Sequence, residues 1–138
     1  MVRHSVHYDG GMAFIGQGNS GQPLVMDATP ESGGQGRGPT PVEALLSAIG
    51  GCTGMDIVSI LGKMHTPPTA MRITLEVERA TEHPRALRRV RLLFALEGPV
   101  PEPNARRAIE LSLTRYCSVL HSLSHDVDID WEVELAAS

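Results

Sequence analysis

The chain has 138 residues and a mass of 14.9 kDa, which is enough for one domain with a buried core. A net charge of −4, a pI near 5.8 and an aromatic content of 4% argue against nucleic acid as a partner, because nucleic-acid-binding proteins present basic patches and stacking aromatic side chains. No uninterrupted apolar run is long enough to span a bilayer, and the first residues lack the apolar core of a signal peptide. We therefore expect a soluble, cytoplasmic protein without a membrane partner, with a single domain over residues 1–138.

The first third of the chain predicts a three-stranded meander. Two short runs, residues 3–8 and 12–17, flank Asp9-Gly10-Gly11, which is a strong tight-turn sequence. A second turn leads to a third run at residues 23–27. The glycine-rich segment 32–38 lacks the lysine and hydroxyl of a P-loop and the spacing of a dinucleotide fingerprint. We therefore interpret this segment as a flexible lead-in to a helix.

A long helix is predicted from residue 40 to about residue 64. Thr40 is a natural N-cap, Pro41 suits the first helical position, and Glu43 at the third position completes a capping box. Two consecutive prolines after the helix prevent it from continuing. Because the helix is apolar or small over most of its surface, we expect it to be buried on all sides.

Two adjacent glycines, Gly50 and Gly51, lie inside this helix immediately before Cys52. Each costs about 1 kcal/mol relative to alanine in a helix interior. Their lack of side chains allows another backbone or a substrate to approach the helix beside the thiol. Tight helix packing in a crowded core explains the pair equally well.

The second half predicts two strands, a helix and a closing strand. Apolar and polar residues alternate over residues 71–78 and again over 90–96, so each strand buries one face. The arginines between residues 85 and 91 are interpreted as a solvated strand face. The closing strand covers residues 127–135. The predicted order is β-β-β-α-β-β-α-β, an α+β fold with an antiparallel sheet and buried central helices. The second helix follows Pro103, and these of its residues lie on one stripe at helical spacing: Ala105, Ala108, Ile109, Tyr116, Cys117 and Leu120.

The two cysteines are either inert core residues or chemically active ones, because structural disulfides are rare in a reducing compartment. A mid-helix Cys52 is by default a small buried hydrophobe. A reactive thiol instead needs nearby positive charge or hydrogen-bond donors. Asp56, one turn further on, would oppose thiolate formation if it faced the same way. Cys117 has the same core-packing alternative, and His121 follows it one turn later. A zinc site from Cys52, Cys117 and His121 is conceivable, but no tight ligand pair supports it.

Two segments carry a family resemblance: GGQGRGPTPVEALLSAIGGCTGMDIVSIL at residues 33–61 and ELSLTRYCSVLHSL at residues 110–123. They contain Pro-x-Glu, a cysteine nine residues after the glutamate, and a second cysteine 65 residues further on. This pattern resembles the OsmC-like family, which includes the organic hydroperoxide reductases. The chain looks closest to a branch with a Gly-Gly-Cys-Thr segment.

The resemblance implies a thiol-dependent peroxidase without metal or organic cofactor. Cys52 would attack an organic hydroperoxide, Cys117 would resolve the product, Glu43 would be a helper carboxylate, and an external dithiol would restore both thiols. In the better-studied branch the glutamate orients an arginine of the first hairpin, which holds the cysteine as thiolate. The corresponding hairpin here, DGGMAF, has no arginine, and Arg37 is the candidate substitute. Two alternatives follow: a non-catalytic dimer that binds a small apolar ligand at its interface, and a thiol protein acting on a persulfide or protein disulfide.

The spacing of Glu43 and Cys52 indicates an oligomer. Nine positions on one straight helix place them half a turn out of phase and roughly 13.5 Å apart along the axis. They cannot touch within one chain, so a shared site needs a partner. The resemblance likewise implies an intertwined homodimer.

Overall fold

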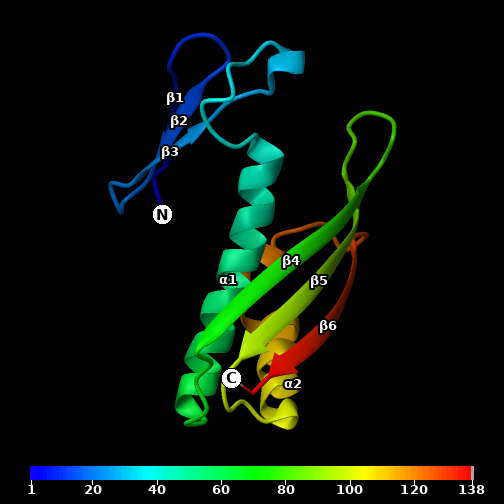
Figure 1. The fold of residues 1–138 in the computed structure, drawn as a ribbon. Coiled ribbons are helices and arrows are strands. Elements are labelled where there is room, and N and C mark those ends of the chain that lie inside the picture. Colours follow the sequence, from blue (N-terminus) through cyan, green and yellow to red (C-terminus); the bar gives the residue numbers. More distant parts are fainter. Residues whose placement is uncertain (138) are drawn as a thin grey trace. The chain divides into compact units, whose positions relative to one another are not determined.

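The computed structural model describes residues 1–137 and divides the chain into two compact units, Met1–Ser47 and Ala48–Ser138. Each unit contains one three-stranded sheet (Figure 1). With helices between and after the strands, the α+β class and the predicted order of its main elements are confirmed. That these units act as one domain stays a prediction.

The first unit contains the predicted meander. Strands β1 (Ser5–Tyr8), β2 (Phe14–Gln17) and β3 (Pro23–Met26) pair antiparallel in that order. The turn between β1 and β2 takes Gly10 and Gly11 through φ values of 89° and 56°, which explains the glycines because other residues adopt this region at a cost. The strands are shorter than predicted, and β1 and β2 begin two residues later.

The segment after β3 is held by hydrogen bonds, which corrects its interpretation as a flexible lead-in. A short 3₁₀ turn, η1 (Pro30–Ser32), is followed by a loop that wraps around the carboxylate of Asp27. That carboxylate is buried and accepts hydrogen bonds from the backbone N–H groups of Ala28, Gln35 and Arg37. These bonds, above all the one from Arg37, hold the pKa of Asp27 below its ordinary value.

Helix α1 (Pro41–Lys63) starts with the predicted capping box. The Thr40 hydroxyl accepts from the Glu43 N–H at 3.2 Å, and the Glu43 carboxylate accepts from the Thr40 N–H at 3.1 Å. In the single chain Met55 and Val58 are exposed, so burial of α1 on all sides would need a partner chain and stays a prediction. The buried residues form one stripe at every fourth position: Ile49, Thr53, Ile57 and Leu61.

By length and composition alone, α1 could also cross a membrane, although no spanning run was expected. This is weak evidence, because the core helix of a folded domain has the same features. The part of α1 that belongs to the second unit packs against strand side chains and hydrogen-bonds to Ser112 and Cys117. Those contacts are the ones a core helix makes.

The sheet of the second unit differs from the prediction in one pairing. Strands β4 (Ala70–Arg79) and β5 (Leu87–Glu97) pair antiparallel, but β5 and β6 (Asp128–Ala136) run parallel. The sheet is therefore mixed rather than antiparallel. A parallel pair needs a long crossover connection, which the helical segment between β5 and β6 supplies.

The two longest helices of this unit, α1 and the helix after β5, cover the same face of the sheet (Figure 1). Leu75 of β4 contacts α1, and Arg106 of α2 (Glu102–Leu111) stacks on Trp131 of β6, whose ring packs edge-on against Phe94. The opposite face is polar, and there Arg89 pairs with Asp130 at 2.8 Å. The buried side of β5 forms the centre of the core: Val90, Leu92, Phe94 and Leu96.

The second helix does not continue through Cys117 as the predicted stripe requires. After α2 the chain widens into a π-helical turn, η2 (Ser112–Tyr116), which leaves Tyr116 exposed. Cys117 is extended (φ −72°, ψ 99°) and caps a separate short helix, α3 (Ser118–His121). The thiol therefore lies at a break between helices.

Candidate active site

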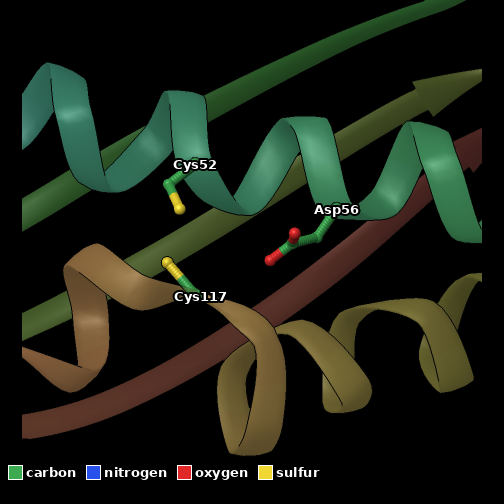
Figure 2. A group of neighbouring side chains, drawn as sticks. All are labelled: Cys52, Asp56 and Cys117. Carbon is green, nitrogen blue, oxygen red and sulfur yellow. The ribbon is translucent and has the colours of Figure 1, made fainter.

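Three side chains meet between α1 and the break before α3. The Sγ atoms of Cys52 and Cys117 and a carboxylate oxygen of Asp56 all lie within 4.8 Å of one another. Figure 2 shows Cys52 and Asp56 projecting from successive turns of α1 toward Cys117 on the facing segment. Two thiols 65 positions apart in the sequence are thus brought into one cluster.

The position of Cys52 depends on how closely α1 approaches β4. A Cβ on Gly50 would lie 3.3 Å from Leu75 Cδ1, and one on Gly54 would lie 3.1 Å from Ile73 Cδ1, both tighter than ordinary contacts. A Cβ on Gly51 would meet nothing within 4 Å. Helix packing therefore accounts for Gly50, and the same argument extends to Gly54. It does not account for Gly51.

Cys117 is fully buried and its sulfur accepts two hydrogen bonds. The Thr53 hydroxyl and the Leu120 backbone N–H each donate to Cys117 Sγ at 3.4 Å. Burial is the largest influence and raises the pKa of the Cys117 thiol. The two donors act in the opposite direction, and the neighbouring Cys52 raises the pKa further. Cys117 is therefore held mainly as a neutral thiol.

Asp56 is the residue of this cluster to which the sequence assigned no positive role. It faces the same way as Cys52, as expected for residues four apart on a helix. The Ser112 hydroxyl donates to Asp56 Oδ2 at 2.8 Å and orients the carboxylate. Ser112 is itself fully buried in η2. The four-residue spacing was the only available signal, and it could not show that Cys117 lies opposite.

His121 does not join the cluster. Its backbone N–H donates to the Cys117 carbonyl, while the residue is exposed at the end of α3. Among the described residues, the side chain that lies close to both cysteines is Asp56 and not His121, which the sequence had suggested as a possible third zinc ligand.

Arg37 and Glu43 belong to the first unit, where both have partners. The Arg37 guanidinium donates to the Asp9 carbonyl at 3.1 Å and pairs with the Asp9 carboxylate at 2.5 Å. This ion pair raises the pKa of Arg37 and keeps the group charged. Glu43 serves the capping box of α1. The roles of Cys52, Cys117, Glu43 and Arg37 in one active site stay a prediction.

The cluster can support dithiol–disulfide chemistry. A disulfide requires the two sulfurs to approach to about 2.05 Å. Because Cys117 lies where the helix is already interrupted, a small backbone movement there can close the gap without unwinding a regular helix. Cys52 is only half-buried and so is accessible from outside.

The OsmC-like protein family model matches residues 34–132, a range that contains this cluster. The chain is 35% identical to protein YhfA of Escherichia coli K12 over 129 residues, 93% of each chain. A hypothetical protein of Aquifex aeolicus has a solved structure with TM-score 0.81 and 27% identity, covering 98% of this chain and 97% of that one. The organic hydroperoxide resistance protein OsmC of Legionella pneumophila shares the fold, with TM-score 0.71 and 16% identity, covering 97% of this chain and 96% of that one. The chain belongs to the OsmC-like family.

Proposed function

We propose that this protein is a thiol-dependent peroxidase that reduces organic hydroperoxides through Cys52 and Cys117. The observation that carries the proposal is the meeting of the two sulfurs at one helix break, in a fold shared with an organic hydroperoxide resistance protein. Two free thiols within reach of one another can supply two electrons to a substrate by forming a disulfide. The Gly-Gly-Cys-Thr branch remains a matter of resemblance.

The surroundings of the two thiols favour different roles. Cys52 is half-buried and can meet a substrate, whereas Cys117 is fully buried and its raised pKa disfavours the thiolate that attack on a peroxide requires. We therefore assign the attack to Cys52 and the resolving step to Cys117.

In the reaction, the Cys52 thiolate attacks the terminal oxygen of the hydroperoxide, the one that carries hydrogen. That bond breaks, the alcohol leaves with a proton, and Cys52 becomes a sulfenic acid. Cys117 then attacks the Cys52 sulfur, a disulfide forms and water leaves with the thiol proton. An external dithiol exchanges with the disulfide and is itself oxidised, which restores both thiols.

Arg37 is the proposed source of positive charge for Cys52. Its guanidinium is bound to Asp9 in the turn of the first hairpin, the element that holds the arginine in the better-studied branch. Asp9 offsets part of this charge.

The proposal includes Glu43 as a helper carboxylate. It also includes a homodimer, the assembly that would bring Arg37 and Glu43 to the thiols. We propose the cytoplasm as the location of the protein.

The test is consumption of cumene hydroperoxide with a dithiol reductant. The wild type should turn over repeatedly, and Cys52→Ser should consume none while keeping its circular dichroism spectrum. Cys117→Ser should complete one turnover and leave a sulfenic acid that dimedone traps. Full multiple turnover by Cys52→Ser would overturn the mechanism.

A second candidate follows from the hairpin without its own arginine: a dimer that binds a small apolar ligand without turnover. Its signature would be unaltered thiols after exposure to hydroperoxide, together with saturable binding of an apolar fluorophore. Rapid alkylation of Cys52 by iodoacetamide near neutral pH would argue against it.

A further inference from the structure

We infer that Cys52, Asp56 and Cys117 form a binding site for a single zinc ion when both thiols are reduced. The inference goes beyond the proposed peroxidase function and does not rest on it. It starts from the convergence of two sulfurs and one carboxylate oxygen within 4.8 Å of one another. These are three of the atom types that zinc binds in proteins.

The dimensions suit a zinc ion after a small contraction. Three atoms no more than 4.8 Å apart surround a central point that lies at most about 2.8 Å from each, whereas zinc bonds are about 2.3 Å to sulfur and roughly 2.0–2.2 Å to oxygen. Each ligand atom therefore needs to move by less than about 1 Å.

The elements that carry the ligands restrict their freedom. Cys52 and Asp56 are four positions apart on α1, a spacing that directs two side chains to the same side of a helix. Cys117 is the N-cap of α3, so its sulfur is aimed by the break in the chain. Cys52 and Asp56 are only half-buried, which leaves an entry path and a fourth position for water.

A second layer of hydrogen bonds is already present. Ser112 donates to one carboxylate oxygen of Asp56, so the other oxygen is available to a metal. The Cys117 sulfur accepts hydrogen bonds from the Thr53 hydroxyl and from the Leu120 N–H, each at 3.4 Å. Such outer partners orient metal ligands and tune their affinity.

Within residues 48–137, no ion pair or hydrogen bond joins a basic side chain to Cys52, Asp56 or Cys117. Two thiolates beside a carboxylate would repel one another in a partly buried site. A divalent ion displaces the two thiol protons to solvent as it binds, and its positive charge offsets the repulsion among the resulting anions. The same ion would block disulfide formation, so the metal-bound and the oxidised states exclude each other.

The test is a titration of the fully reduced, metal-free protein. Zinc should bind at one ion per chain in competition with a chromophoric chelator, with release of protons to the buffer. Cobalt(II) should give the thiolate-to-metal charge-transfer band and the visible bands of a tetrahedral site. Bound zinc should also protect both cysteines from iodoacetamide. None of these measurements uses hydroperoxide, so a failure here and a failure of the peroxidase assay are distinguishable.

Variants assign the ligands. Asp56→Asn should weaken zinc binding at least tenfold, and Ser112→Ala should weaken it by about tenfold to a hundredfold through its effect on the carboxylate. Cys52→Ser should lose most of the charge-transfer intensity. His121→Ala and Asp126→Asn, at exposed positions outside the cluster, should bind like the wild type. Absence of stoichiometric zinc binding, a cobalt spectrum without thiolate charge transfer, or unchanged affinity in Asp56→Asn would each overturn the inference.

Discussion

Substituting alanine for each of two glycines of α1 tests why the helix accepts glycine beside Cys52. Alanine is favoured over glycine by about 1 kcal/mol in a helix interior. At Gly51 the new methyl group meets nothing within 4 Å, so Gly51→Ala should raise the free energy of unfolding by about 0.5–1 kcal/mol. At Gly54 the methyl group lies 3.1 Å from Ile73 Cδ1. Overpacking costs about 1–3 kcal/mol, which cancels or exceeds the gain.

The two variants should therefore differ by about 1–3 kcal/mol in the free energy of unfolding, with Gly51→Ala the more stable. Urea denaturation followed by circular dichroism measures this difference. All samples need the same protomer concentration, because dissociation of an oligomer would add a concentration-dependent contribution. Hydroperoxide consumption is measured on the same samples.

A Gly51→Ala variant as unstable as Gly54→Ala would refute the open-space reasoning. The methyl group would then collide with something that packs beside Cys52 in solution. A variant that gains stability but loses hydroperoxide consumption would instead indicate that Gly51 keeps the thiol accessible to substrate.

Thr40→Ala removes the hydroxyl of the capping box and should lower the free energy of unfolding by about 1 kcal/mol in urea denaturation, with little effect on thiol reactivity. Folding lowers the pKa of Asp27 from 3.8, so its contribution to stability is fully present above pH 3.8 and is lost as the pH falls through the folded pKa. Asp27→Asn should therefore reduce the loss of stability at acid pH in a series of unfolding curves. Arg37→Ala should slow alkylation of Cys52 near neutral pH, and an unchanged rate would remove Arg37 from the site. Sedimentation at low micromolar concentration should show a dimer, whereas a stable folded monomer of about 15 kDa would contradict the composite site.

Features that depend on neighbouring residues could be predicted from the sequence. The capping box is one: Thr40 and Glu43 form it across three positions, and no other part of the molecule is needed. The first hairpin is another, because Gly10 and Gly11 adopt the positive φ values that its turn requires. The alternating strands β4 and β5 were equally clear, since one face of each is buried.

Features that depend on distant residues were missed or misjudged. The predicted stripe through Cys117 assumed a regular helix, but η2 widens where Ser112 binds Asp56 of another helix. The direction of β6 relative to β5 is set by the crossover and not by the alternation of its own residues. The same reasoning explains the site: the spacing of Cys52 and Asp56 was visible, but their meeting with Cys117 is a tertiary contact.

Both proposals answer one electrostatic requirement of this cluster. A reactive Cys52 must be a thiolate, yet Asp56 lies beside it and Cys117 sits in a buried position that disfavours charge. A nearby cation would stabilise the thiolate. Arg37 is the candidate when the site acts on hydroperoxide, and zinc is the candidate when the site is reduced and at rest.

The Asp56→Asn variant distinguishes the two roles because it should change two measurements in opposite directions. Removal of the negative charge should speed alkylation of Cys52 in the metal-free protein, and it should weaken zinc binding. Slower alkylation in metal-free Asp56→Asn would show instead that the carboxylate assists the thiol, as an acceptor of its proton.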